Sequence, residues 1–110
     1  MSYQDYKLKK KSLIIETIQE IINVEGLDVK DRTRSLANRR FYLMYYLRRN
    51  TLLTHTEIAS MFGNAVTNHA SSIHGIRTHY NLMEYNDSEY IKNIQVIKDY
   101  LNEEFISLSE

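Results

Sequence analysis

The chain has 110 residues and a mass of 13.1 kDa, with 43% hydrophobic and 25% charged residues, which indicates a single folded domain over 1–110. No apolar run approaches the roughly 20 residues that a membrane-spanning helix needs, and no signal-peptide pattern occurs, so we expect a cytoplasmic protein that does not bind membranes. Cysteine is absent, which excludes disulfides, thiolate catalysis and cysteine-based zinc sites.

The formal net charge is zero, but the charges are segregated along the chain. Residues 1–29 carry four basic and five acidic side chains, residues 30–83 carry eight and two, and residues 84–110 carry two and seven. The middle segment therefore has a charge of +6, and its flanks have charges of −1 and −5. Such a layout gives one electropositive face that can meet phosphates, while the acidic end limits indiscriminate binding of polyanions. Chance combined with solubility is the alternative explanation.

Proline is absent and glycine occurs three times, which predicts an all-α fold of about five helices. Apolar residues at helical spacing predict the first, second and last of them, over about 7–25, 35–49 and the segment after 86–89. Gly26 and Ser35 mark the end of the first helix and the cap of the second. The three stripes consist of Ile14, Ile15, Ile18, Ile21 and Ile22, then Leu36, Leu43, Met44 and Leu47, then Tyr90, Ile91, Ile94, Ile97, Leu101 and Phe105.

Two shorter helices are expected between the second and the last. Thr-His-Thr-Glu at residues 54–57 fits a capping box and predicts a helix over 57–62, before a turn at Gly63. A further helix opens near Asn68, and its apolar residues Ile73, Ile76 and Tyr80 predict its buried face. Two helices joined by a glycine-containing turn match the helix-turn-helix motif, whose second helix enters the major groove of DNA.

Six arginines gather in and just before the second predicted helix: Arg32, Arg34, Arg39, Arg40, Arg48 and Arg49. The arginine fork suits phosphates and guanine edges. Arg32 and Arg34 precede the helix on a segment that is free to extend, as a basic arm in a minor groove does. Arg40 falls inside the apolar stripe, where a charge needs a partner, and we consider a phosphate or Glu57.

On the helix that follows Asn68, a small uncharged face points away from the predicted apolar stripe, with His69 and His74 at its edges. Asparagine can read adenine, serine can donate or accept, and the methyl group of Ala70 can meet a thymine. The other residues of this face are Asn68, Ser71, Gly75 and Thr78.

Enzyme chemistry is not indicated. His69, His74 and His79 recur every five residues, so they do not share the i, i+4 face of a metal-binding pair. The 110 residues contain no phosphate-loop pattern, no GxSxG and no paired carboxylates in an apolar setting. We therefore expect no catalytic residues, no metal and no cofactor.

Several motifs follow one another in a specific order. They are Arg-Thr-Arg-Ser-Leu-Ala-Asn-Arg-Arg at 32–40, Met44-Tyr45, Thr51, Glu57-Ile58, Phe62-Gly63 and Asn-His-Ala-Ser-Ser-Ile-His-Gly at 68–75. In this order and at nearly this spacing they resemble the C-terminal DNA-binding domain of the bacterial replication initiator DnaA. The resemblance covers residues 30–80 closely and the last helix loosely.

This resemblance implies sequence-specific binding of duplex DNA, with the recognition helix in the major groove and the basic loop in the adjacent minor groove. Arg32 matches the minor-groove arginine, and Arg40 and Arg48 match basic positions near the backbone. The remaining matches are His55 and Thr56, where main-chain amides meet a phosphate, the base readers Asn68, His69, Ala70 and Ser71, and His74, the second histidine of the motif.

The chain also departs from the family pattern. Two additional residues lie between Phe62 and His69, Thr67 stands nearest to an arginine of the family, and Ala70 and Ser72 replace a threonine and a valine. The apolar stripe and the family motif place the recognition helix in registers that differ by one residue. The ATPase module of the initiator is not contained in these 110 residues.

We therefore predict a five-helix, stand-alone protein in which an additional N-terminal helix (1–29) and an acidic C-terminal helix (84–110) flank a helix-turn-helix core (30–83). It would bind double-stranded DNA and regulate replication or transcription in a bacterial or phage-infected cell. The alternative is a protein interaction module that keeps the fold without DNA binding and docks through its first or last helix. The isoleucine face of the first helix fits either the core of one chain or the interface of a homodimer.

Overall fold

The computed structural model describes the backbone of residues 2–66 and 68–109 and the side chains of residues 2, 5, 9–66 and 68–102. These residues form α1 (Tyr3–Glu25), α2 (Arg34–Asn50), α3 (His55–Ser60), a 3₁₀ turn η1 (Gly63–Ala65), α4 (His69–Glu84) and α5 (Ser88–Ser109), with no strand among them. The prediction of an all-α fold with about five helices is confirmed. Thr67 and the side chain of Phe105, both named above, lie outside the described residues and side chains.

The helix ends follow local sequence signals. Gly26 ends α1 in the left-handed conformation, with φ of 67°, as its position after the isoleucine stripe predicts. Thr54 and Glu57 form the predicted capping box, but α3 begins at His55, two residues before the predicted start, because the cap is Thr54. The predicted cap Ser35 is also displaced, since the cap position of α2 is Thr33.

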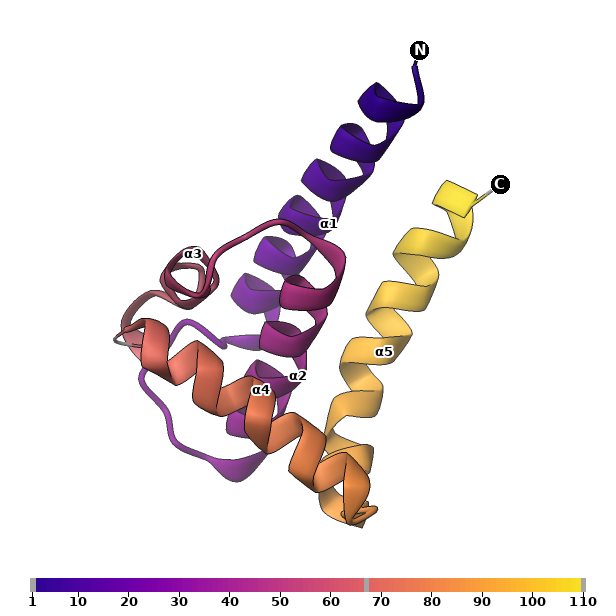
Figure 1. Ribbon diagram of the computed structural model, residues 1–110. Helices are drawn as coiled ribbons and strands as arrows, with labels where there is room; N and C mark the ends of the chain where they lie inside the picture. The colour runs from indigo at the N-terminus through magenta and orange to yellow at the C-terminus, as the bar shows by residue number, and fades with distance from the viewer. Residues whose placement is uncertain (1, 67, 110) are drawn as a thin grey trace.

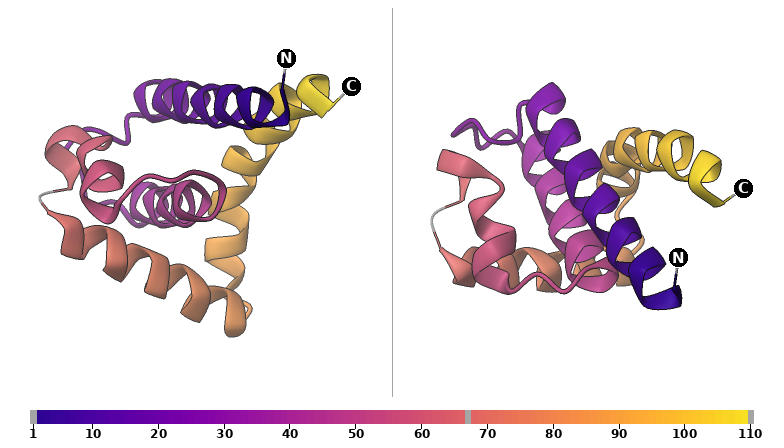
Figure 2. Two further views of the ribbon diagram at one scale, coloured as in Figure 1. Left: turned by 45° about the horizontal axis from the view of Figure 1, so that its top comes forward. Right: turned by 90° about the horizontal axis from the view of Figure 1, so that it is seen from above.

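The α2 helix lies at the centre of the fold and contacts α1, α3, α4 and α5. α1 and α4 lie on opposite sides of α2, and α5 packs along its remaining side (Figure 2). α4 runs from the neighbourhood of α3 to the start of α5, while the free ends of α1 and α5 extend in the same direction beyond the other helices (Figure 1). This arrangement leaves α4 with one face on α2 and the opposite face uncovered.

One cluster of buried side chains connects α1, α2, α5 and the α3 region. Ile18, Leu43, Ile58 and Ile94 are fully buried representatives from the four parts, and each such residue contributes about 1.5–3 kcal/mol of hydrophobic stabilisation. The isoleucine face of α1 belongs to this cluster, so it completes the core of its own chain. Within the described residues no helix is long and apolar enough to cross a membrane.

The buried face of α4 differs from the predicted one. Ile73 and Tyr80 are 39% and 54% exposed, whereas Ser72, Gly75 and His79 are buried. Ser72 faces α3, Gly75 faces α2, and His79 lies between α2 and α5. The prediction that Ile73, Ile76 and Tyr80 form the inner face is therefore wrong by one residue, and only Ile76 of the three is half-buried. Ser72, Gly75 and His79 are buried because they allow α4 to approach α2 closely or form hydrogen bonds with other helices, and not because they are hydrophobic.

Gly75 and His79 show the physical reason for this register. A Cβ atom at Gly75 would overlap the Met44 sulfur and lie 3.1 Å from a ring carbon of Phe41, so a larger residue would require the Met44 side chain to move. His79 is buried because its Nδ1 lies 2.6 Å from the Tyr90 hydroxyl of α5 and its ring stacks on Tyr45 at a centroid distance of 4.0 Å.

Candidate nucleic-acid interface

α3 and α4 pack against each other, and the connection between them turns at Gly63, which has φ of 56°. At the start of α3, the Nδ1 atom of His55 lies 3.1 Å from the Oγ atom of the buried Ser72 in α4 and forms a hydrogen bond with it. Burial, followed by the positive charges of Arg48 and His69, lowers the pKa of His55. The hydrogen bond fixes the start of α3 against the side of α4.

The uncovered face of α4 forms a ridge between two open depressions. On the side of α2, a depression of about 370 Å³ is lined in part by Phe41, Ala70 and His74. On the side of α3, a depression of about 430 Å³ is lined in part by Arg48, His55, Ile73 and Arg77. The exposed residues along this face are His69, Ala70, Ile73, His74, Arg77, Tyr80 and Asn81.

The loop between α1 and α2 is held from inside by Arg40. The Nε, Nη1 and Nη2 atoms of this side chain donate hydrogen bonds to the carbonyl oxygens of Leu27, Asp31 and Val29, at 2.8, 2.8 and 2.7 Å. Burial lowers the pKa of Arg40, and the charges of Asp31 and Asp28 act in the opposite direction.

The role predicted for Arg40 is therefore corrected. Arg40 is buried as the apolar stripe predicts, but its partners are three loop carbonyls in place of a phosphate or Glu57. The carboxylate of Glu57 accepts from the Thr54 main-chain N–H in the capping box. Arg40 therefore shapes the basic loop, and this residue is only 6% exposed.

Arg32 is one of the side chains that this loop exposes to solvent, together with Val29 and Lys30. Among the described residues nothing forms a hydrogen bond or ion pair with Arg32, which is exposed. The residues before and after Arg32 are bonded to each other: the Asp31 carboxylate accepts hydrogen bonds from the main-chain N–H and the hydroxyl of Thr33. These bonds lower the pKa of Asp31 and order the loop. The loop also lies next to the turn that precedes α4, since a Cβ atom at Gly63 would be 3.5 Å from the Cβ atom of Asp28.

The other arginines differ in how much of their charge is available. Arg34 forms ion pairs with Asp87 at 3.8 Å and Glu89 at 3.5 Å, although its side chain is 62% exposed. Arg39 is bound to Glu25 and to the Asn93 carbonyl. Arg48 remains exposed and donates one hydrogen bond to the Leu53 carbonyl.

Most of the predicted site residues lie together around the first half of α4. Arg48 and His55 line one side of the ridge, and Ala70, Ser71 and His74 line the other side. Asn68 is the cap of α4, since its side chain accepts from the Ser71 N–H, and Thr56 is exposed in the first turn of α3. Arg34 and Arg40 are the two whose charges are engaged elsewhere.

Four exposed residues of the ridge were not included in the site by the sequence analysis: Ile73, Arg77, Tyr80 and Asn81. Ile73 and Arg77 are the two nearest to the predicted site residues. Ile73 follows Ala70 by three residues and Arg77 follows it by seven, and this helical spacing places the three residues on one face of α4. The register of the family motif would have found them, whereas the apolar stripe assigned Ile73 to the core. The error in register therefore caused both omissions.

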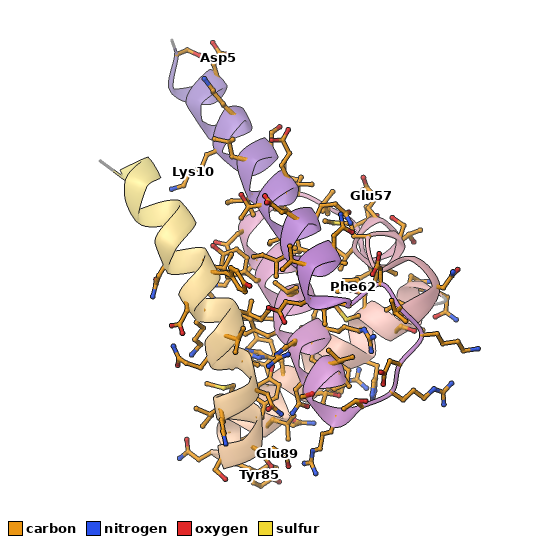
Figure 3. All side chains as sticks on the ribbon, turned by 180° about the vertical axis from the view of Figure 1, so that it is seen from behind. Asp5, Lys10, Glu57, Phe62, Tyr85 and Glu89 are labelled. Atoms are coloured by element: carbon orange, nitrogen blue, oxygen red, sulfur yellow. The ribbon has the colours of Figure 1, made fainter. Side chains whose placement is uncertain are left out.

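The acidic side chains of Glu84, Asp87 and Glu89 lie at the end of α4 that is farther from α3. Tyr85 and Glu89 mark the junction of α4 and α5, at the opposite end of the molecule from Glu57 beside α3 (Figure 3). Among the described residues no group of three or more His, Asp or Glu side chains is placed to hold a metal ion. Neither a protein-family model nor a curated protein sequence nor a solved structure matches the chain.

Proposed function

We propose that the protein binds double-stranded DNA sequence-specifically and thereby regulates replication or transcription in the cytoplasm of a bacterial or phage-infected cell. In this proposal α3 and α4 act as a helix-turn-helix, with the ridge of α4 in the major groove and Arg32 in the neighbouring minor groove. The observation that carries the proposal is the unpaired, exposed Arg32 on an ordered loop beside the turn that leads into α4.

The shape of α4 supports this proposal. The helix has 16 residues and is therefore about 24 Å long, and a major groove about 12 Å wide admits one α-helix. Small side chains at the start of the ridge, Ala70 and Ser71, allow the backbone of α4 to approach base edges closely. His69 and His74 add hydrogen-bonding groups beside them.

The charge distribution gives a second line of support. Arg48 and Arg77 line the depression on the α3 side of the ridge, where a DNA backbone bordering the groove would run. The acidic junction of α4 and α5 lies at the other end of α4, so the favourable end of the ridge is the one near α3. Electrostatic attraction therefore favours approach of the α3 end of α4 to the DNA.

The proposal is tested by selection from random duplex DNA on the purified protein, followed by affinity measurements on the best site and on a scrambled duplex at two salt concentrations. We expect the best site to bind at least ~10³-fold more tightly than the scrambled duplex. Equal, strongly salt-dependent affinities for the two duplexes would reduce the proposed function to non-specific electrostatic binding.

Arg32→Ala tests the minor-groove role directly. We expect this variant to lose ~1–3 kcal/mol on the best site and less on the scrambled duplex, because a groove contact depends on sequence. Lys92→Ala, which removes an exposed cation of α5, is the matched control and should leave the ratio of the two affinities unchanged. An equal loss on both duplexes with Arg32→Ala would refute the reading role.

The second candidate function is a protein interaction module that lacks specific DNA binding. It is favoured by the ion pairs of Arg34 with Asp87 and Glu89, which engage one predicted DNA contact within the fold. Absence of binding to any duplex at low salt would favour this candidate.

A further inference from the structure

The depression on the α3 side of the ridge combines the apolar side chains of Ile73, Ile76 and Tyr80 with the cationic side chains of Arg48 and Arg77. Ile73 is 39% exposed because the inner positions of the helix are taken by Ser72, Gly75 and His79. Ala70 precedes it by about one turn, and Arg77 follows it by one turn on the same face. An exposed aliphatic group beside cationic side chains is suited to a ligand that offers an apolar contact next to negatively charged groups.

Base edges of DNA offer one such contact in the major groove, the 5-methyl group of thymine. Phosphate oxygens offer no apolar contact, and contacts with the deoxyribose carbons do not depend on the base sequence. Arg48, which lines the same depression as Ile73, and Arg77 beside it carry the charges that complement a phosphate backbone. An exposed aliphatic side chain beside two arginines therefore fits duplex DNA, which offers a thymine methyl group next to phosphates.

We propose that Ile73 is a specificity-determining residue that packs against a thymine 5-methyl group, so that the recognition sequence contains a thymine at the position facing Ile73. The inference rests on the proposed function, since it requires the ridge of α4 to lie in the major groove. It adds a constraint on the target that the predicted small polar face did not contain, because Ile73 was assigned to the core.

The test removes the methyl group from the DNA and the side chain from the protein. Each thymine of the best selected duplex is replaced in turn by deoxyuridine, and dissociation constants are measured by fluorescence anisotropy for the wild type and for Ile73→Ala. At one position we expect the wild type to lose about fourfold in affinity, which is the value of one buried methyl-sized group. Ile73→Ala should bind the thymine and deoxyuridine duplexes equally well.

Two control variants accompany this experiment. Val24→Ala shortens a side chain on α1 that is more exposed than Ile73 and should keep the full discrimination of the wild type. Ile73→Val retains a branched aliphatic group and should keep part of it. Circular dichroism and thermal melting establish that Ile73→Ala remains folded, as its exposure leads us to expect.

The outcomes separate the inference from the proposed function. A preferred duplex for which Ile73→Ala keeps the wild-type ratio at every thymine would overturn the inference and leave sequence-specific binding intact. The same holds if the wild type itself loses no affinity at any deoxyuridine position. If no duplex is preferred at all, the proposed function fails and the role of Ile73 fails with it.

Discussion

The stability of the fold should depend on pH through His79. This side chain is 5% exposed, and burial together with the charge of Lys98 lowers its pKa to about 4. The neutral form of His79 is favoured because its ring stacks on Tyr45 and its Nδ1 can accept a hydrogen bond from the Tyr90 hydroxyl. Burial also raises the pKa of Tyr90, so the phenol keeps its proton as donor.

The sign and size of the effect follow from linkage. In the unfolded chain His79 titrates near its ordinary pKa of 6.5, so below that pH the unfolded state binds more protons than the folded state. The stabilisation is therefore complete above pH 6.5 and is lost as the pH falls towards about 4. Between about pH 7 and about pH 5, these two pKa values correspond to a loss of ~2 kcal/mol.

Urea denaturation followed by far-UV circular dichroism measures this loss across the same pH range. His79→Gln removes this titrating group and should remove most of the ~2 kcal/mol loss that His79 contributes, although its stability at neutral pH is lower. His69→Gln, at an exposed position of the same helix, should retain the wild-type pH dependence. An identical slope in the wild type and in His79→Gln would refute the reasoning.

Three other substitutions test the contacts that position the candidate site. Gly75→Ala should destabilise the protein by ~1–3 kcal/mol, because overpacking against Met44 outweighs the gain in helix propensity, and adding Met44→Val should recover part of the loss in urea melts. Arg40→Lys keeps the charge but loses the forked guanidinium group, so it should lower the free energy of unfolding by at least ~2 kcal/mol. It should also accelerate tryptic cleavage within residues 27–33, and unchanged cleavage would contradict the role of Arg40. Arg48→Ala should weaken binding to all duplexes alike and reduce the salt slope by about one, as loss of one phosphate contact does.

The elements that sequence reasoning predicted best are those with local causes. The capping box at Thr54 and Glu57 and the left-handed Gly26 each depend on a few neighbouring residues, so their geometry is visible in the sequence. The isoleucine face of α1 repeats at helical spacing over several turns, which identifies both the helix and its buried side. Errors of one or two residues at the starts of α2 and α3 concern only which residue is the cap.

The buried face of α4 was not predictable in the same way. A hydrophobicity argument places Ile73 and Tyr80 inside, because it ranks side chains by their transfer from water. The structure instead buries His79 and Gly75. The hydrogen-bond partner of His79, Tyr90, is on another helix, and Gly75 lacks a side chain where the Met44 side chain packs. Both depend on long-range contacts, which a single helix does not display.

Arg40 shows the same division between local and long-range causes. Its place within the apolar stripe of α2 correctly indicated that the charge is buried and needs partners. The partners are main-chain carbonyls of a loop, and every residue type carries such a group, so no sequence pattern identifies them. The prediction of a phosphate or Glu57 considered only partners that are recognisable by residue type.

The polar residues of the interior fix the geometry of the proposed interface. Ser72 connects α4 to the start of α3, His79 connects α4 to α5, and Arg40 connects α2 to the loop that carries Arg32. Hydrogen bonds have preferred directions, whereas apolar contacts tolerate rotation of one helix on another, so these bonds set which face of α4 remains uncovered. The exposure of Ile73 and Arg77 is a consequence of these hydrogen bonds. A substitution at Ser72, His79 or Arg40 should therefore change the orientation of the ridge or of the basic loop more than it changes the packing of the hydrophobic core.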